Sequence, residues 1–404
     1  MSDTKPYQIF VPDSKLDRLK QKLALTDFPS RKNDLGSGSW KQGPPLDEIQ
    51  RLAGVWQSSF DWRKVEADLN ALPHFTASIE AESFGTFDVH FVHKQSIQAN
   101  AIPLLFLHGW PGSFHEVTKI LDPLVQGVSN GGLTFHVVAP SLIDFGFSSP
   151  SKEGFQMQNH AEVYDRLMQK LGDPGRRRRF LISRFMARTY GPSRCMACHI
   201  NTPAPSRPTE DTHPELHAQM MTTQLTEAEQ KGLEGAGNFS QEGSGYYKLQ
   251  STKPLTVGYS LKDSPVGLLA WIYEKLHDWS DDYPWTDEEI LTWVSIHYFS
   301  TSGPEATSNV YYAMEHRRPP AFASAAEYID VPLGISRFMN DLVLLPKLWN
   351  KTLGPVVFEG DHIKGGHFAA WERPEAIVQD LRAMLGESAL GHDIAKRLRR
   401  EADQ

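Results

Sequence analysis

The apolar residues of the chain follow two patterns. Short, nearly continuous apolar runs at 103–107 (PLLFL) and 133–140 (LTFHVVAP) are typical of buried strands. At 75–79 and 87–93 apolar residues alternate with polar ones, which predicts two half-buried strands. Residues 195–201 are a further candidate strand. Apolar residues three or four positions apart predict helices at 14–25, within 46–72, from about 114, at 160–171 and at 181–190.

The order of these elements predicts an α/β protein. Strands followed by helices indicate a mostly parallel sheet with helices on both faces. From 202–205 (TPAP) to about 320 the chain reads as helices and loops, and strand-like sequence returns at 328–334 and 356–358. A helical block inserted in a sheet domain predicts a cap over the strand ends, where such sheets bind ligands. We expect further helices at 226–231, 265–277, 287–300 and 376–385, and a glycine-rich passage at 232–245.

Composition excludes some classes of function. The 404 residues include 41 Lys plus Arg against 49 Asp plus Glu, and the formal charge of −8 argues against a nucleic-acid partner. Hydrophobic residues make up 40% of the chain, enough for a sizeable core, yet no apolar run reaches the roughly 18 residues of a membrane span. The first residues lack the apolar core of a signal peptide, so we expect a cytoplasmic protein.

The two cysteines, Cys195 and Cys198, form a single C-x-x-C pair. A zinc site needs a second pair or a histidine partner, and a redox pair needs a helix N-terminus beside it. The pair instead follows a helical stretch, so two reduced structural cysteines are the better interpretation.

The apolar run at 103–107 ends abruptly in His108-Gly109-Trp110-Pro111-Gly112. Glycine lets the backbone approach a ligand closely, and such a turn leaves backbone N–H groups available to one. The corner can therefore hold a developing oxyanion. An ordinary strand–turn–helix junction would explain the same residues.

A second candidate lies near the end of the chain, where His367 follows two glycines. A loop histidine at a strand end can act as a general base, and Asp341, 26 residues earlier, could orient it. A structural histidine is the competing interpretation. The order of corner, cap, acid and histidine is that of the α/β-hydrolase fold, while the lack of G-x-S-x-G disfavours a serine esterase.

Four motifs in this order resemble the microsomal-type epoxide hydrolases, including their fungal soluble members. They are FDWR at 60–63 with LN at 69–70, HGWPG at 108–112, DSPVGL at 263–268 and GGHFAA at 365–370. The resemblance covers nearly the whole chain. It implies an α/β-hydrolase fold with a mostly parallel sheet, a helical cap and an N-terminal wrapping segment. The expected division is 1–95 for the N-terminal segment, 96–203 and 321–404 for the core, and 204–320 for the cap.

The resemblance also implies a two-step hydrolysis of a small apolar epoxide, of the kind used in detoxification and aromatic-hydrocarbon catabolism. A carboxylate opens the epoxide and forms an alkyl-enzyme ester, while two cap tyrosines hydrogen-bond the epoxide oxygen. By motif position the tyrosines are Tyr246 and Tyr311, with their neighbours Tyr247 and Tyr312 as rivals. The resemblance implies that His367, oriented by Asp341, activates water. It also implies that backbone N–H groups near Trp110 stabilise the oxyanion. No metal or organic cofactor is implied, and a homodimer is left open.

The nucleophile departs from the family pattern, which places an aspartate in G-G-D-W-G after an apolar strand. Residues 172–180 read GDPGRRRRF, with no apolar strand and several residues too few. Counting back from the helix at 181 puts Arg177 at the nucleophile position, and counting forward from 171 offers Asp173. Pro174 follows Asp173 and lacks the N–H that should serve the oxyanion.

Three explanations of this segment stay open, so the nucleophile is unknown. The gene model contains an error or a misplaced splice boundary; the chain is an inactive relative that acts as a binding protein; or Asp173 replaces the nucleophile. Four adjacent arginines make a poor central strand, because each buried arginine needs a partner, and a solvated surface loop is the competing interpretation of the run. Paired cap tyrosines disfavour a haloalkane dehalogenase. As written, the chain is expected to hydrolyse epoxides poorly or not at all.

Overall fold

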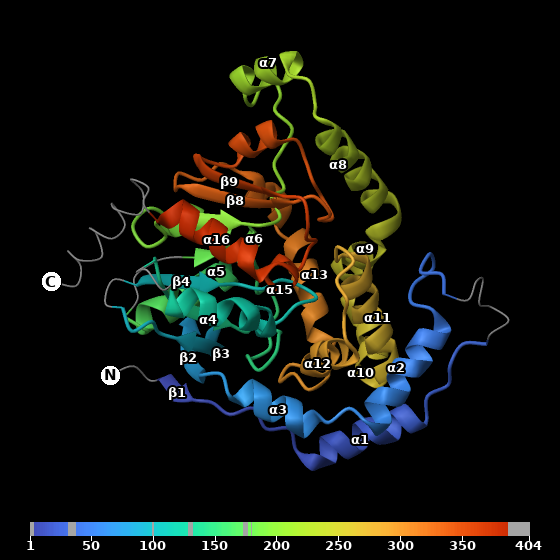
Figure 1. Ribbon diagram of the computed structural model, residues 1–404. Helices are drawn as coiled ribbons and strands as arrows, with labels where there is room; N and C mark the ends of the chain where they lie inside the picture. The colour runs from blue at the N-terminus through green and yellow to red at the C-terminus, as the bar shows by residue number, and fades with distance from the viewer. Residues whose placement is uncertain are drawn as a thin grey trace.

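A computed structural model describes residues 4–30, 38–98, 101–127, 132–172, 177–178 and 180–386, with the backbone alone at 177, 178, 180 and 181. The described residues form one nine-stranded sheet in the order β1-β2-β3-β5-β4-β6-β7-β8-β9 (Figure 1). Strands β4 to β9 run parallel to one another, and β1 to β3 are added antiparallel at one edge. The predicted mostly parallel sheet is confirmed.

The parallel strands arise mostly from apolar runs whose side chains are buried on both faces of the sheet. The strand expected at 328–334 begins later, because Pro332 has no N–H to give to a ladder and pairing starts after it. The parallel strands are β4 (Ile102–Phe106), β5 (Phe135–Pro140), β6 (Arg177–Arg178), β7 (Cys198–Ile200), β8 (Leu333–Phe338) and β9 (Val356–His362).

The antiparallel edge comes from the N-terminal part of the chain. It consists of β1 (Thr4–Pro6), β2 (His74–Ala81) and β3 (Gly85–Lys94). The tight connection between β2 and β3 places Ser83 at φ 65° and Gly85 at φ 73°. Glycine adopts this left-handed conformation without strain, which explains its place at the start of β3.

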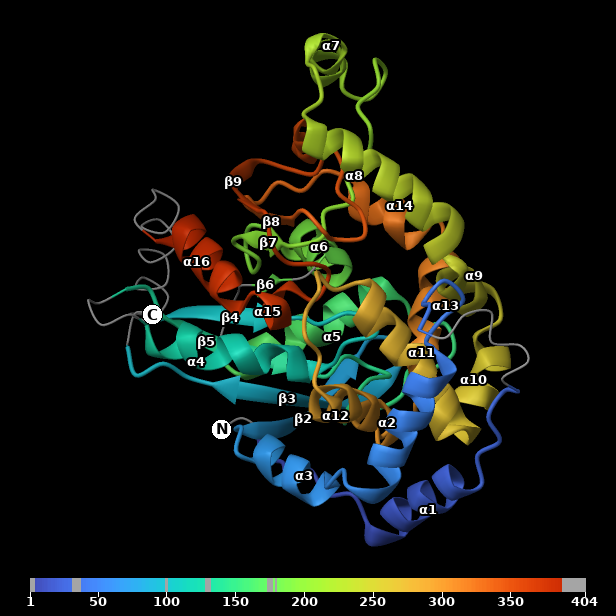
Figure 2. The ribbon, with the colours of Figure 1, turned by 45° about the vertical axis from the view of Figure 1, so that its right-hand side comes forward.

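Two groups of helices cover opposite faces of the sheet (Figures 1 and 2). Members of each group contact one another. One group is α4 (Thr118–Gln126), α15 (Ala369–Glu372) and α16 (Pro374–Leu385), and the other is α5 (Met157–Lys170) and α6 (Phe180–Tyr190). These bounds confirm the predicted helices to within a few residues, except that the turn at Phe114–Val117 before α4 is 3₁₀.

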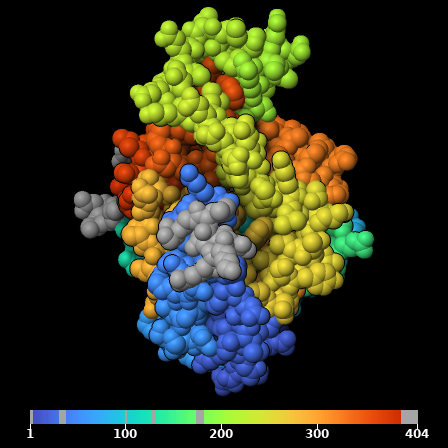
Figure 3. Space-filling view, turned by 90° about the vertical axis from the view of Figure 1, so that its right-hand side faces the viewer, coloured from blue at the N-terminus to red at the C-terminus, as the bar shows by residue number. Residues whose placement is uncertain are grey.

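A block of helices connects β7 to β8, as the change of pattern at 202–205 predicts. From it α7 stands out and α8 leads back along the molecule (Figures 2 and 3). The helices are α7 (Pro214–Thr222), α8 (Glu227–Asn238), α9 (Gly245–Thr252), α10 (Pro254–Asp263), α11 (Pro265–Asp278), α12 (Asp287–Tyr298), α13 (Asn309–Glu315) and α14 (Ala321–Ala326).

The short helix expected at 226–231 is longer in the structure and continues into the glycine-rich passage at 232–245. Helix α8 runs through its first half, and a π-turn at Phe239–Gly243 follows. Tertiary contact explains the difference, because a Cβ at Gly232 would lie 2.2 Å from the Leu344 carbonyl oxygen. The glycine therefore permits a close approach, which offsets its helix penalty of about 1 kcal/mol.

The N-terminal helices lie along the outside of this helical block (Figure 3). They are α1 (Asp13–Ala24), α2 (Leu46–Ser58) and α3 (Trp62–Asn70). Ion pairs join them to the block at Lys22–Asp263, Arg51–Asp287 and Lys64–Glu288. Such exposed pairs add little stability, so the apolar contacts of α2 with α11 and α12 hold the segment in place.

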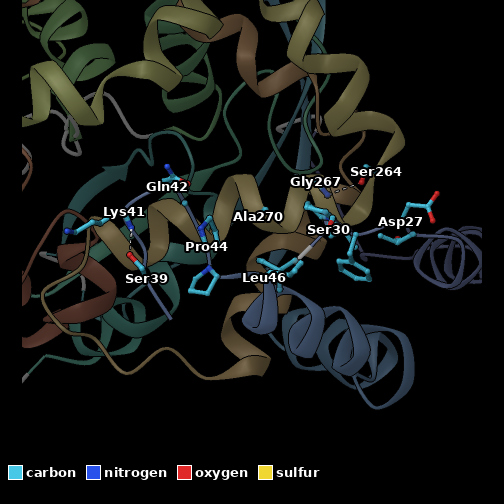
Figure 4. A pocket seen from close by; sticks show the side chains of 17 residues that line it. Asp27, Ser30, Ser39, Lys41, Gln42, Pro44, Leu46, Ser264, Gly267 and Ala270 are labelled. Atoms are coloured by element: carbon cyan, nitrogen blue, oxygen red, sulfur yellow. Dashed lines mark hydrogen bonds between the residues drawn. The ribbon is translucent and has the colours of Figure 1, made fainter. Parts of the chain in front are cut away.

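A hollow of about 540 Å³ lies between this N-terminal segment and α11 (Figure 4). Segments 26–30 and 39–46 form one wall and residues 264–270 the other. Figure 4 shows Lys41 and Asp27 at its two ends, and none of the predicted site residues lines it.

The arginine run contradicts the prediction made for it. The backbone of Arg177 and Arg178 forms β6 in the middle of the sheet, between β4 and β7, and not a surface loop. Its neighbours on both sides need a central strand there to satisfy their backbone N–H and C=O groups. Strand pairing therefore overrides the unfavourable local sequence.

The division of the chain at residues 95, 203 and 320 stays a prediction.

No helix in the described ranges combines the length and the apolar character needed to cross a bilayer.

Candidate active site

The site lies at the carboxyl edge of the parallel strands. In the sheet Phe106 is level with Arg178, Arg178 with His199, and His199 with Gly334. The connections after β4, β6, β7 and β8 therefore begin at the same height, where ligands bind in open α/β sheets.

The corner after β4 is fixed by buried hydrogen bonds. The Pro111 carbonyl accepts from Trp293 Nε1 at 2.8 Å and from His297 Nε2 at 2.7 Å, both on α12. His108 Nε2 accepts from the Leu142 N–H at 3.0 Å. Burial lowers the pKa of His297 to about 4, so at neutral pH its imidazole is uncharged and donates through Nε2. The corner is thus held rigidly from α12 and from the loop after β5.

Two further features suit this corner to an oxyanion. Gly112 lets the Glu116 carboxylate pack against the backbone of the corner, because a Cβ there would lie 1.7 Å from Glu116 Oε1 and would displace that side chain. The N–H of Trp110 has no hydrogen-bond partner among the residues that the structure describes, and Trp110 lines the adjoining cavity. A backbone donor of this kind can stabilise negative charge that develops in the cavity.

The predicted base and acid lie in contact. His367 Nδ1 and Asp341 Oδ1 are 2.9 Å apart, and the Asp341 side chain is only 3% exposed. The second oxygen of Asp341 accepts from Thr202 Oγ1 at 2.8 Å, and the Leu342 N–H donates to the first at 2.7 Å. These bonds leave the other imidazole nitrogen of His367 toward the cavity that His367 lines.

The two predicted tyrosines lie together above the corner. The Tyr246 ring stacks on Trp110 with centroids 5.0 Å apart, and Tyr311 meets Tyr246 edge-on at 5.6 Å. Burial raises the pKa of Tyr246 to about 12, and a hydrogen bond with Tyr311 opposes the rise. Burial raises the pKa of Tyr311 well above its ordinary value of 10. Both phenols are therefore protonated at neutral pH.

The rival tyrosines point elsewhere. The Tyr247 hydroxyl donates to the Glu315 carboxylate, and Tyr312 is 42% exposed and stacks on His316. Neither lines the cavity that holds Tyr246 and Tyr311. The structure thus distinguishes Tyr246 and Tyr311, which line the cavity, from their sequence neighbours Tyr247 and Tyr312, which do not. The sequence alone could not make this distinction.

These groups surround one cavity of about 250 Å³ between the strand edge and the helical block. Most of its wall is apolar, with His108, Asn201 and Thr202 as further polar lining residues, so an apolar ligand is well accommodated there. The lining includes Trp110, Leu142, Phe145, Met157, Ile182, Phe239, Tyr246, Trp279, Val310, Tyr311, Met314, Phe322, Leu342 and His367.

The sequence between β6 and α6 supplies no carboxylate. Strand β6 ends at Arg178 and α6 begins at Phe180, and residues 177–181 read RRRFL. Asp173 lies outside the described residues. Gly172 is the last residue described before it and follows the end of α5. Met157, the first residue of α5, lines the cavity. Helix α5 has 14 residues and is about 20 Å long.

The cysteines take no part in this site. Both are buried thiols, and Cys198 Sγ lies 3.6 Å from Ser183 Oγ. Within the described ranges, no three His, Cys, Asp or Glu side chains are grouped so that they could hold a metal ion.

Sequence reasoning missed several side chains around the base. Thr202 lies two residues after the end of β7, so a polar residue near a strand end was the available signal. Trp279 directly follows α11, and the centroid of its ring lies 5.1 Å from that of His367. Lys275 is 3% exposed, and its ammonium group lies 5.3 Å from the centroid of the Tyr246 ring. Nothing in the sequence pattern marked Lys275, because charged residues on a helix usually face solvent.

Comparison with known proteins agrees with this geometry. Residues 4–117 match the family model "Epoxide hydrolase N terminus", and residues 102–175 match "alpha/beta hydrolase fold". Epoxide hydrolase 1 of Sus scrofa is 31% identical over 420 residues, which cover 95% of this chain and 88% of the relative. The chain belongs to the epoxide hydrolase family.

Solved structures agree as well. The Aspergillus niger epoxide hydrolase is 34% identical, with a TM-score of 0.82 over 95% of this chain and 96% of the other. The juvenile hormone epoxide hydrolase of Bombyx mori has a TM-score of 0.85 at 23% identity, over 99% and 96%. This second likeness concerns the fold alone. The predicted α/β-hydrolase fold is confirmed.

Proposed function

We propose that the cavity binds a small apolar epoxide. One observation carries this proposal: the two phenols, Trp110 and His367, which Asp341 contacts from behind, all line a single, mostly apolar cavity of about 250 Å³. Phenols donate hydrogen bonds, and an epoxide oxygen can only accept them. The names of the relatives, which are epoxide hydrolases, support the same substrate class.

Tyr246 and Tyr311 are proposed to hold the epoxide oxygen and to protonate it as the ring opens. When the C–O bond breaks, the oxygen becomes an alkoxide, which is a far stronger base than the epoxide. One of the two phenols gives its proton to this alkoxide, and the other donates a hydrogen bond to the same oxygen.

His367 is proposed to be the general base. In the family reaction it takes a proton from water while the oxygen of that water attacks the carbonyl carbon of the alkyl-enzyme ester. The bond from that carbon to the alkyl oxygen then breaks, the departing oxygen takes the proton from His367, and the diol leaves. The proton released as the nucleophile becomes a carboxylate again returns to the phenol that gave one up in the first step. The Trp110 N–H stabilises the oxyanion that forms in the attack on the ester. Asp341 fixes the imidazole and stabilises it when protonated, at the 2.9 Å contact.

We further propose that this chain turns over epoxides slowly or not at all. The ester needs a carboxylate within bonding reach of the epoxide carbon, and residues 177–181 contain none. In the alternative route, His367 activates a water molecule that attacks the epoxide ring directly. This route does not form the alkyl-enzyme ester of the family reaction. Loss of one member of such a catalytic unit typically costs several orders of magnitude in rate. We propose no metal or organic cofactor.

The second candidate function is an inactive member of the family that acts as a binding protein. The arginines at the β6–α6 connection favour it, because the pocket and the remaining polar groups are kept while the nucleophile is not. The proposed division of the chain into N-terminal segment, core and cap holds for both functions. A homodimer is compatible with both.

Binding and turnover test the epoxide site and the proposed loss of turnover separately. Styrene oxide is titrated into purified protein while tryptophan fluorescence is followed, because Trp110 and Trp279 line the cavity. We expect saturable quenching that Tyr311→Phe weakens and, in the same samples, little or no diol. No saturable binding would refute the epoxide site, and rapid diol formation would refute the proposed loss of turnover.

A further inference from the structure

The buried carboxylate of Glu372 lies directly behind the proposed base. Glu372 is the last residue of α15 and is 6% exposed. Its Oε2 accepts from the Gly366 N–H at 3.0 Å and from the Asp281 N–H at 2.8 Å, and its Oε1 accepts from the Phe368 N–H at 2.9 Å. One carboxylate thus binds the peptide N–H groups on either side of His367.

Other groups complete the anchoring of the same loop. The His367 N–H donates to the Trp279 carbonyl at 2.8 Å, and the Gly365 N–H donates to Asp281 Oδ2 at 2.8 Å. Four consecutive backbone N–H groups, 365 to 368, are therefore held. A Cβ at Gly366 would lie 2.5 Å from the Trp279 carbonyl oxygen, so the loop can approach α11 this closely only with glycine there.

The carboxylate is held in place by backbone dipoles rather than by a cation. Within the described part of the chain, no lysine or arginine lies within ion-pair distance of Glu372. Burial raises the pKa of Glu372, while the three backbone donors and then a positive charge on His367 lower it. A buried, multiply bonded carboxylate that serves only the loop of the base is costly to keep without a function.

We infer that Glu372 is a positioning residue: it fixes the backbone on both sides of His367 and thereby sets where the imidazole stands relative to Asp341 and the cavity. It touches no substrate atom. It also joins two parts of the chain, because Asp281 lies in the connection between α11 and α12, whereas residues 366 and 368 belong to the loop after β9. A displacement of that connection would thus be transmitted to the base.

The inference rests on the proposed role of His367, but its test does not depend on turnover. Amide hydrogen exchange at residues 365–368 and the low-field proton signal of His367 Nδ1–H are measured by NMR in the whole chain. Glu372→Gln keeps the size of the side chain and loses its charge. Glu66→Gln is the control for the loss of a buried carboxylate, because Glu66 is equally buried and accepts from the Val11 N–H and from Trp62 Nε1, far along the chain from the base. Unlike Glu372, Glu66 also pairs with a cation, Arg63.

In Glu372→Gln we expect exchange at Gly366 and Phe368 to accelerate by about ten- to a hundredfold, in line with lost hydrogen bonds to a charged group, and the Nδ1–H signal to broaden or vanish. Glu372→Asp, which keeps the charge, should recover part of both. Glu66→Gln should change neither. Unchanged exchange and an unchanged signal in a folded Glu372→Gln would overturn the inference.

A measurement without any variant covers the case in which the Glu372 variants do not fold. In the unaltered chain the amides of residues 366 and 368 should exchange as slowly as those of the central strand β4. Fast exchange there, at the rate of exposed loops, would contradict the inference. Absence of epoxide turnover would leave these readouts untouched and would bear only on the proposed function.

Discussion

The burial of His297 beside the corner carbonyl makes part of the stability of this protein depend on pH. His297 is 1% exposed, and its Nε2–H donates to the Pro111 carbonyl at 2.7 Å. Burial lowers its pKa from 6.5 to about 4, with the Pro111 bond opposing the shift. Because the folded-state pKa is depressed, the stabilisation is complete above pH 6.5 and is lost as the pH falls toward 4.

The size of the loss follows from proton linkage. At pH 4.5 His297 is almost fully protonated in the unfolded chain, whereas it is neutral in most folded molecules. Folding at this pH therefore releases most of one proton per molecule. A pKa difference of this size corresponds to about 2–3 kcal/mol of unfolding free energy lost between pH 7.5 and pH 4.5. Other buried histidines with lowered pKa, such as His115 and His160, shift stability in the same direction. The His297 contribution must therefore be measured as a difference between variants.

The assay is urea unfolding at pH 7.5 and pH 4.5, followed by tryptophan fluorescence. His297→Gln keeps a side-chain N–H donor for the Pro111 carbonyl but cannot titrate, so the stability lost on acidification should shrink by about 2–3 kcal/mol. Trp293→Phe is the matched control, because it removes the other donor to the same carbonyl without removing a titrating group. It should lower stability at both pH values equally. A His297→Gln variant that loses as much stability on acidification as the unaltered chain would refute this reasoning.

Three further predictions concern the cavity. Tyr246→Phe should weaken epoxide binding in the fluorescence titration by about tenfold, the effect of one lost hydrogen bond. Tyr247→Phe should leave binding unchanged. Equal effects of the two variants would contradict the assignment of Tyr246 to the epoxide site. Gly366→Ala should lower the melting temperature by several degrees in calorimetry, because its Cβ would meet the Trp279 carbonyl oxygen at 2.5 Å; an unchanged melting temperature would count against this. Thr202→Val removes a 2.8 Å hydrogen bond to the acid of the pair and should broaden the low-field Nδ1–H proton signal of the base; a sharp, unshifted signal would show that this bond is dispensable.

The sequence pattern predicted the parts of the fold in which local preference and burial agree. The strand at 103–107 and its abrupt glycine and proline corner correspond to β4 and the loop around Trp110. Helices with clear apolar spacing, such as α5 and α16, were found within a few residues of their bounds. In these segments side-chain spacing and hydrogen bonding favour the same structure, so the sequence alone suffices.

The pattern failed where long-range contacts decide. Strand β6 consists of two arginines, and only the need of β4 and β7 for a neighbour explains why the backbone is extended there. Helix α8 continues beyond the helix expected at 226–231 into the glycine-rich passage, where Gly232 approaches Leu344 closely. Neither effect is encoded within a short window of sequence, because the partner lies far along the chain.

The sequence predicted the residues that line the candidate site better than the buried residues that pack behind them. His367 and Trp110 stand in short sequence motifs, Asp341 was chosen as an acid after a strand, and the choice of Tyr246 and Tyr311 came from the family resemblance. Glu372 and Lys275 were missed, since an acidic residue at a helix end and a lysine in a helix ordinarily face water. Their burial is a property of the packed structure and has no local signature.

The central claim is that the chain keeps an epoxide site while lacking the carboxylate that would make it fast. Diol formation from styrene oxide by the purified chain tests this most directly, beside Asp173→Asn and His367→Ala under the same conditions. The account predicts a rate close to that of buffer for all three proteins. Rapid diol formation that Asp173→Asn abolishes would contradict it and would identify Asp173 as the nucleophile. Rapid formation that survives Asp173→Asn but not His367→Ala would also contradict it, and would point to direct attack by water.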